Sequence, residues 1–174
     1  MQFEQAFDWI ISKEGGYVEN LSDRGGATKY GISSKFIQAN DLKINDVKDL
    51  SLADAKQIYR VFFWNPLCID RFSDKMIKLF VFDSAVNCGK SKSVDFLQKC
   101  INSLTHIAVD GVIGNETIST CNNLTANSYL RKILKKLLIS SRLSYYMHIV
   151  NNNESQRVFL RGWINRTLEV SQIG

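Results

Sequence analysis

The residues best suited to chemistry lie near the start of the chain. Glu14 precedes a pair of glycines, and Asp23 and Thr28 follow a short distance along. A carboxyl group that stays protonated donates a proton as a general acid, while a second, ionised carboxylate orients water or stabilises positive charge. Hydrolysis of a glycosidic bond needs both kinds of group, so these residues predict that chemistry.

Glu14 ends a stretch with helical periodicity. The apolar residues before it recur at helical spacing, at Phe3, Phe7, Ile10 and Ile11. The glycine pair then ends the helix. Because the unpaired carbonyl groups at this end carry partial negative charge, they disfavour an ionised carboxylate, and an apolar wall acts in the same direction. We therefore expect Glu14 to be the proton donor.

The segment that follows, from about Tyr17 to Ile32, is rich in glycine, threonine and aromatic residues. This composition predicts a short β-hairpin, which we expect to turn at Arg24-Gly25-Gly26. A hairpin facing the helix end would make a cleft, with Asp23 across it from Glu14 and Thr28 holding water. Two ordinary roles remain open: Asp23 as a partner of the turn backbone, and Thr28 as a strand residue.

Motifs along most of the chain carry a family resemblance. They are Glu14-Gly15-Gly16-Tyr17, the run DRGGATKYGI from Asp23 to Ile32, the turn DGVIGNET from Asp110 to Thr117, and Gly162-Trp163-Ile164-Asn165-Arg166. Together they resemble the lysozyme-like muramidases of glycoside hydrolase family 108, whose C-terminal half is a helical peptidoglycan-binding region. The order Glu14, Asp23, Thr28 also resembles that of phage-type lysozymes, with a shorter interval between Asp23 and Thr28.

The resemblance implies an endo-acting N-acetylmuramidase that needs no cofactor. Such an enzyme cleaves the β-1,4 bond between N-acetylmuramic acid and N-acetylglucosamine, for wall lysis or for wall opening in protein secretion. The stereochemical outcome stays open, because inverting and retaining enzymes differ in the separation of their two carboxyl groups. Two alternatives also stay open: a lytic transglycosylase that uses the same glutamate, and a non-catalytic wall-binding accessory protein.

Aromatic and amide side chains supply candidate sugar contacts, because the apolar face of a pyranose packs on an aromatic ring. The candidates are Tyr17, Tyr30, Trp64, Asn87 and Trp163. Asn87 would hydrogen-bond an acetamido group, or else cap the helix that ends near Gly89. Trp163 shares a helix face with Arg166 by its spacing, and a buried tryptophan beside a structural arginine is the alternative to a ligand contact. Core packing is the alternative for the other rings.

The composition excludes several classes of protein. With 174 residues and 45% hydrophobic content, the chain can bury a core. No stretch approaches the ~20 apolar residues of a membrane span, and the opening residues lack the pattern of a signal peptide. We therefore expect no stable membrane insertion and synthesis in the cytoplasm. The family resemblance implies action on the cell wall, which is the periplasm in a Gram-negative host, and with it a holin or export partner that carries the protein across the membrane.

Metal and nucleic-acid sites are not expected. The cysteines, at positions 68, 88, 100 and 121, lack zinc or redox spacing, and the two histidines have no partner at ligand spacing. We predict free thiols packed in helices. The formal net charge of +5 suits an acidic polymer such as the glycan strands of peptidoglycan. The basic segment 131–136 alternates with leucines, which indicates the outer face of a helix rather than a nucleic-acid patch.

Helix signals fill the rest of the chain. Starts are expected at Ser33 or Ser34, at Ser51 with a capping box, and at Ser73, Ser91, Asn115, Thr125 and Glu154. We predict a mainly α, lysozyme-like α+β fold: a helical bundle with one small β-hairpin lining the active-site cleft. The family resemblance divides it into a catalytic region, residues 1–91, and a peptidoglycan-binding region, residues 92–174, packed against it.

Overall fold

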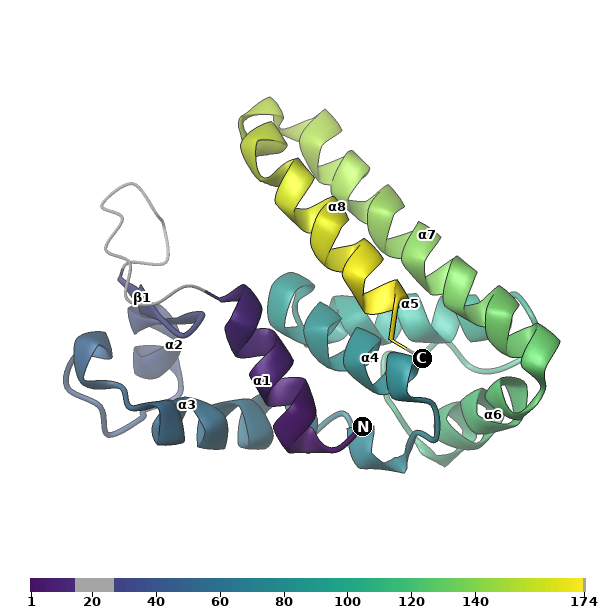
Figure 1. Ribbon diagram of the computed structural model, residues 1–174, viewed down its shortest axis with the longest axis horizontal. Coiled ribbons are helices and arrows are strands. Elements are labelled where there is room, and N and C mark those ends of the chain that lie inside the picture. The colour runs from purple at the N-terminus through teal and green to yellow at the C-terminus, as the bar shows by residue number, and fades with distance from the viewer. Residues whose placement is uncertain (15–26, 174) are drawn as a thin grey trace. The chain divides into compact units, whose positions relative to one another are not determined.

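A computed structural model describes residues 1–14 and 27–173 (Figure 1). The described chain is mainly helical with one two-stranded antiparallel sheet, which confirms the predicted class. It divides into two compact units, an N-terminal unit of residues 2–62 and a C-terminal unit of residues 63–174 to which Met1 also belongs. No helix in the described ranges is both long enough and apolar enough to span a bilayer.

The N-terminal unit begins with the predicted amphipathic helix. Its elements are α1 (Phe3–Lys13), β1 (Thr28–Lys29), β2 (Ile32–Ser33), α2 (Ser34–Ala39), η1 (Val47–Asp49) and α3 (Leu52–Tyr59). Helix α1 buries Phe3, Phe7 and Ile10 on one face, as the periodicity predicts. Within the unit, the Phe7 ring lies 5.8 Å from the Tyr59 ring of α3. This contact joins α1 to α3, and both helices contribute to the site described below.

The β-hairpin of the N-terminal unit pairs Thr28 with Ser33 and Lys29 with Ile32. Its turn is made by Tyr30 and Gly31, whose φ angles are 55° and 75°. A two-residue turn with two positive φ angles matches the twist of the strands, and glycine adopts that conformation without strain. The turn expected at Arg24-Gly25-Gly26 lies outside the described residues.

Two helix starts in the N-terminal unit follow the predicted signals. The Ser33 hydroxyl accepts a hydrogen bond from the Phe36 amide at the start of α2. Ser51 and Asp54 form the predicted capping box at the start of α3. A π-helical turn, η2 (Arg60–Trp64), follows α3, and the helix ends before Pro66, which has no amide proton to continue it.

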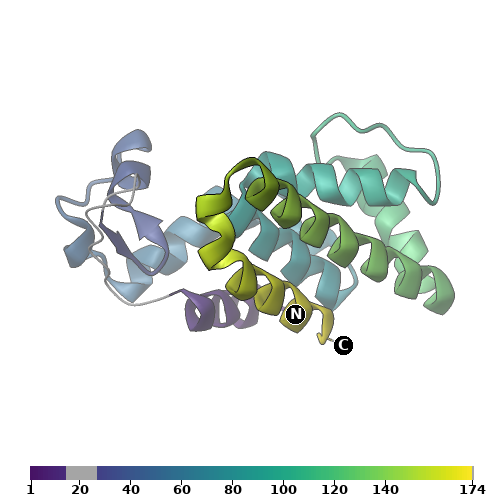
Figure 2. The same cartoon turned by 90° about the horizontal axis from the view of Figure 1, so that it is seen from above.

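The C-terminal unit is a helical assembly around α4. Its elements are η3 (Ile69–Arg71), α4 (Lys75–Cys88), α5 (Lys90–Asn102), α6 (Asn115–Ala126), α7 (Ser128–Asn152), η4 (Glu154–Gln156) and α8 (Arg157–Ser171). Residues 79–85 of α4 are all buried, as expected for a central helix. Helices α7 and α8 lie side by side in both views (Figure 1, Figure 2).

Three predicted helix starts in the C-terminal unit are wrong by a few residues. Asp74 rather than Ser73 caps α4, accepting hydrogen bonds from the Met76 and Ile77 amides. Helix α5 starts directly after Gly89, so no serine cap is used. The chain breaks at Asn127, whose side chain caps α7, and not at Thr125. Carboxylate and amide caps are as effective as serine, so spacing alone does not choose between neighbours.

The turn at Asp110 is held by a buried glutamine. Gln98 is 1% exposed, and its amide nitrogen donates to Asp110 Oδ1, the Val112 carbonyl and Thr117 Oγ1. Its amide oxygen accepts from the Gly111 N–H at 2.8 Å. The hydrogen bond from Gln98 and the Val112 N–H lower the pKa of Asp110. The turn therefore has a structural role, and it leads into α6, which starts at Asn115 with Gly114 in the N-cap position.

Candidate active site

Glu14 lies at the C-cap of α1, as the sequence predicts, and is half-buried. Its amide donates to the Ile10 carbonyl at 3.0 Å, which completes the last turn of the helix. Its side chain packs against the turn of the hairpin: a Cβ placed on Gly31 would lie 2.8 Å from Glu14 Cγ and 2.9 Å from Glu14 Cδ. The helix end and the hairpin thus meet at this carboxyl group.

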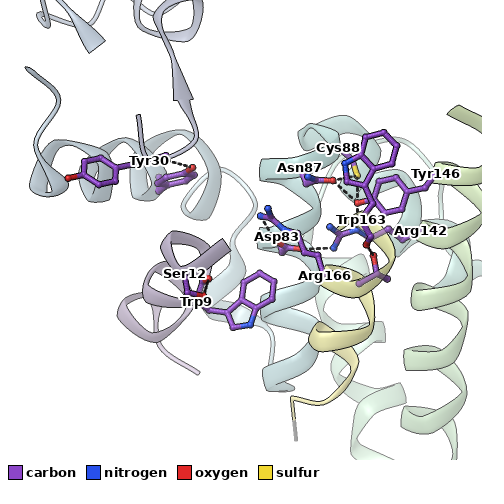
Figure 3. Close-up of polar contacts among 12 residues, drawn as sticks. Trp9, Ser12, Tyr30, Asp83, Asn87, Cys88, Arg142, Tyr146, Trp163 and Arg166 are labelled. Atoms are coloured by element: carbon purple, nitrogen blue, oxygen red, sulfur yellow. Dashed lines mark hydrogen bonds and ion pairs between the residues drawn. The ribbon is translucent and has the colours of Figure 1, made fainter. Parts of the chain in front are cut away.

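Tyr59 of α3 fixes the hairpin turn beside Glu14. The Tyr59 hydroxyl donates a hydrogen bond to the Tyr30 carbonyl at 2.9 Å (Figure 3). A Cβ added to Gly31 would lie 2.7 Å from the same hydroxyl. Tyr59 is 1% exposed, so the contact is rigidly supported by the core. Nothing in the sequence indicates this hydrogen bond, because Tyr59 falls among the apolar positions of α3, which is typical of a core residue.

The other predicted site residues of this unit are distributed as follows. Thr28 lies in β1 and is half-buried, and Tyr30 is in the turn with Lys29 Nζ 5.5 Å from its ring centre. Asp23 and Tyr17 lie outside the described residues. Their predicted roles, as second carboxylate and as stacking ring, therefore stay predictions.

A second polar group, which we call the α4–α7–α8 cluster, lies within the C-terminal unit (Figure 3). It consists of Asp83 and Asn87 from α4, Arg142 and Tyr146 from α7, and Arg166 from α8. Asp83 and Arg142 are both 0% exposed and form an ion pair. Arg166 Nε donates to the second Asp83 oxygen at 2.7 Å. Burial is the largest single influence on the pKa of Arg142 and lowers it, but the Asp83 carboxylate, with smaller contributions from Tyr146 and Cys88, acts in the opposite direction, and together they raise that pKa.

Asn87 does not cap the end of α4, the alternative considered from sequence. Its Oδ1 accepts a hydrogen bond from the Tyr146 hydroxyl at 2.6 Å. Arg142 Nε donates to the same hydroxyl at 2.7 Å, and Cys88 Sγ lies 3.4 Å from it. Burial is the main cause of the raised pKa values of Tyr146 and Cys88. Both groups therefore stay protonated at neutral pH.

The two candidate tryptophans differ in exposure. Trp163 is half-buried and stacks on Tyr146, with ring centroids 4.9 Å apart and planes at 21°. Trp64 is 1% exposed and packs edge-on against Phe82 at 5.2 Å. Core packing, the alternative kept open for Trp64, describes this residue, because it presents no ring face to a saccharide. Arg166, bound to Asp83, is the structural arginine that the spacing with Trp163 allowed.

No group of three or more metal-ligating side chains occurs among residues 1–14 and 27–173. The four cysteines are free. Cys88, Cys100 and Cys121 are helical as predicted, whereas Cys68 lies in a turn with a positive φ of 48°. Burial raises the pKa of the Cys100 thiol to about 11 and that of Cys121 to about 12. These two thiols are structural, apolar-like groups.

Comparisons with known proteins agree with this architecture. Residues 7–89 match the family model described as Glycosyl hydrolase 108, and residues 92–168 match one described as Predicted Peptidoglycan domain. The structure of Brucella abortus SagA superposes with a TM-score of 0.77 at 28% sequence identity, covering 97% of this chain and 91% of that one. No curated protein matches the chain.

A mainly helical fold with a small hairpin packed on a glutamate at a helix end places the protein among the lysozyme-like glycoside hydrolases. The chain belongs to glycosyl hydrolase family 108, with a peptidoglycan-binding region as its second half. It is accordingly a peptidoglycan hydrolase.

The boundary between the two family regions differs from the boundary between the two compact units. The first family region ends at residue 89 and the second begins at residue 92, whereas the compact units divide the sequence between residues 62 and 63. Helix α4 therefore belongs to the first family region but packs within the C-terminal unit. The functional division after residue 91 stays a prediction.

Proposed function

We propose that the protein is an endo-acting N-acetylmuramidase that hydrolyses the β-1,4 bond between N-acetylmuramic acid and N-acetylglucosamine. The observation that carries this proposal is the position of Glu14, at the end of α1 and in packing contact with the Tyr30–Gly31 turn. A general acid must hold its proton near one fixed point, the oxygen of the bond that breaks. Packing on two sides gives Glu14 that fixed position.

In the proposed reaction, Glu14 protonates the leaving oxygen while positive charge develops at the anomeric carbon of the muramic acid residue. Asp23 acts as the second carboxylate, which either activates water or stabilises the cationic sugar. Thr28, on β1, holds the water. Measuring the anomeric configuration of the first product by NMR decides between inversion and retention, because only one of the two is formed initially.

Substrate contacts are proposed for each unit by itself. In the N-terminal unit, Tyr17 and Tyr30 would stack on sugar rings. In the C-terminal unit, Asn87 and Trp163 would contact glycan. The half-exposed state of Tyr30, Asn87 and Trp163 supports their part of this proposal. The net charge of +5 would favour encounter with the carboxylates of peptidoglycan.

The cellular role that we propose is cell-wall lysis or wall opening for protein secretion. The enzyme would be made in the cytoplasm and act in the periplasm of a Gram-negative host, delivered by a holin or a dedicated export partner. Fractionation of cells with and without the candidate partner tests this role. Enzyme that reaches the periplasm without any such partner would contradict it.

The direct test of the activity is the identity of the ends released from purified peptidoglycan. A muramidase leaves reducing N-acetylmuramic acid, which borohydride converts to muramitol. Reducing N-acetylglucosamine would assign the neighbouring bond, and 1,6-anhydromuramic acid would assign a lytic transglycosylase. Wall that is bound without release of any end would assign a non-catalytic binding protein. Only the first result supports the proposal.

A further inference from the structure

The hydroxyl of Tyr146 has all of its hydrogen-bonding directions fixed by its neighbours. Arg142 Nε lies 2.7 Å from it, and an arginine can only donate. The Cys88 thiol lies 3.4 Å from the hydroxyl and 3.6 Å from Asn87 Oδ1, so it is a weak donor to one of these two oxygens. A phenol carries one proton, so the Tyr146 proton is directed to the remaining neighbour, Asn87 Oδ1, at 2.6 Å (Figure 3). The order of donors and acceptors therefore runs in one direction, from Arg142 to Asn87.

This order is anchored in the core of the C-terminal unit. Asp83 binds Arg142 on one side and Arg166 on the other, and Asp83, Arg142 and Tyr146 are at most 1% exposed. Reversing this order of donors and acceptors would need a deprotonated arginine, which does not occur in proteins. The raised pKa of Tyr146, caused chiefly by burial, keeps its proton in place.

The consequence falls on Asn87. Because its amide is planar and Oδ1 faces Tyr146, Nδ2 must face the other way. Nδ2 has no hydrogen-bond partner among the described residues, and the side chain is half-buried. Gly89, at the adjacent helix junction, is exposed, and a Cβ there would meet nothing within 4 Å. Asn87 thus presents a donor, and no acceptor, to a ligand.

We propose that Tyr146 is a positioning residue that orients Asn87 to donate its amide N–H to an acceptor oxygen of the bound glycan, the carbonyl of an N-acetyl group. The aromatic rings beside it suit such a ligand. Trp163 stacks on Tyr146, and Phe159, 53% exposed, stacks on Trp163 at 5.9 Å. An acetamido group combines an apolar methyl with a carbonyl acceptor. This inference rests on the proposed function, because it takes peptidoglycan glycan as the ligand.

The net charge of the α4–α7–α8 cluster also favours an acceptor oxygen on the ligand. Asp83 contributes one negative charge, while Arg142 and Arg166 contribute two positive charges. A net positive group stabilises an oxygen that carries partial or full negative charge. A carboxylate of the glycan or its peptide offers the same acceptor chemistry, so the experiment must separate these two sources.

The first test replaces Asn87 and measures glycan binding by calorimetry. The probe is the peptide-free tetrasaccharide of alternating N-acetylglucosamine and N-acetylmuramic acid, in a Glu14→Gln background that prevents turnover. Asn87→Asp keeps the shape and still accepts from Tyr146 but has no donor. We expect Kd to rise about tenfold or more, equivalent to the loss of about 1.4 kcal/mol. Unchanged Kd in Asn87→Asp would overturn the proposal.

Asn87→Ala controls for the added charge of aspartate, and it should lose binding to a similar extent. A tetrasaccharide with its N-acetyl groups removed separates the two acceptor sources. If the protein that keeps Asn87 and the two Asn87 variants all bind this probe weakly, the acceptor is the acetamido carbonyl. If the protein that keeps Asn87 binds the probe normally while Asn87→Asp and Asn87→Ala do not, the acceptor is a carboxylate, which would overturn the acetamido assignment.

The second test asks whether Tyr146 acts through Asn87. Tyr146→Phe should raise Kd severalfold when Asn87 is present and have no further effect on Kd in Asn87→Ala, as expected for coupled residues. Tyr145→Phe is the matched control, because it makes the same change one residue away, at a hydroxyl without a hydrogen bond to any described residue. Equal effects of Tyr146→Phe in both backgrounds would show a purely structural role and overturn the positioning role.

Failure of this inference is distinguishable from failure of the proposed function. If wild type releases muramitol-yielding ends while the Asn87 variants bind normally, only the inference fails. If wild type neither binds the tetrasaccharide nor cleaves peptidoglycan, the proposed function fails first, and the inference falls with it.

Discussion

Gly31 lies directly against the side chain of Glu14, and no other residue type fits this contact without movement. A Cβ on Gly31 would approach Glu14 Cγ to 2.8 Å and the Tyr59 hydroxyl to 2.7 Å. The φ angle of +75° is also one that side chains with a Cβ rarely adopt. The hairpin turn therefore serves as one wall of the Glu14 site, and glycine is required for both its space and its backbone conformation.

Gly31→Ala should therefore damage folding and activity together. We expect a loss of roughly 2–4 kcal/mol in the free energy of unfolding, from the steric overlap and the strained φ angle. Glu14 must also move to relieve the overlap, so kcat should fall by more than the residual unfolded fraction explains. Urea denaturation and a reducing-end assay on the same preparation measure the two effects.

Gly162→Ala is the matched control for this substitution. Gly162 lies in α8, where an added Cβ meets nothing within 4 Å. Alanine should leave the protein as stable or stabilise it by roughly 0.5–1 kcal/mol, because glycine is a poor helix former. If Gly31→Ala is as stable and active as Gly162→Ala, the contact between Gly31 and Glu14 does not exist in solution.

Gln98→Leu should release the Asp110 turn. Leucine is similar in size but leaves the Gly111 N–H, Thr117 hydroxyl and Val112 carbonyl without the partner that Gln98 supplies. The expected loss is roughly 2–4 kcal/mol in the free energy of unfolding. Faster amide hydrogen exchange at Gly111 and Val112 should accompany it. Gln38→Leu, at an exposed glutamine of α2, should change stability by less than ~0.5 kcal/mol.

Alkaline pH should destabilise the protein through its buried thiols. The pKa of Cys121 is about 12 in the folded chain, against an ordinary value of 9.0, so the contribution of this thiol is complete below pH 9 and is lost as the pH rises towards 12. Between those values the unfolded chain alone releases the proton. The free energy of unfolding then falls by about 1.4 kcal/mol per pH unit for this group.

Comparing Cys121→Ala with wild type isolates that contribution. Denaturation midpoints from pH 8.5 to 11 should fall less steeply for the variant, even though the lost packing lowers its stability at pH 8.5. Cys100, with a pKa of about 11, should behave similarly over a narrower range. Parallel pH profiles for wild type and Cys121→Ala would show that the thiol titrates normally in the folded state.

Local sequence signals predicted the elements that depend on neighbouring residues. The amphipathic pattern of α1 and the following glycines placed Glu14 at a helix end, and the Ser51 capping box placed the start of α3. Both signals act within a few residues of the chain. The hairpin was predicted as an element, but the described turn at Tyr30–Gly31 was not, since two neighbouring glycine-containing turns suit a hairpin equally well.

Contacts between distant residues were not predictable in the same way. Asp83 meets Arg142 and Arg166, which are 59 and 83 positions away. No periodicity or spacing encodes that encounter, because it depends on how α4, α7 and α8 pack. The same holds for Trp64: its ring is buried on Phe82, and the sequence alone could not separate a core tryptophan from a sugar platform.

The most direct test of the account is the effect of Glu14→Gln on release of reducing ends from purified peptidoglycan. Glutamine keeps the size of the side chain and its packing against Gly31 but cannot donate a proton as an acid. We expect kcat to fall at least about 10²-fold, with an unchanged unfolding midpoint. Asp8→Asn, at an exposed carboxylate of the same helix, should retain full activity. Lytic activity of Glu14→Gln comparable to that of Asp8→Asn would contradict the assignment of Glu14 as the acid.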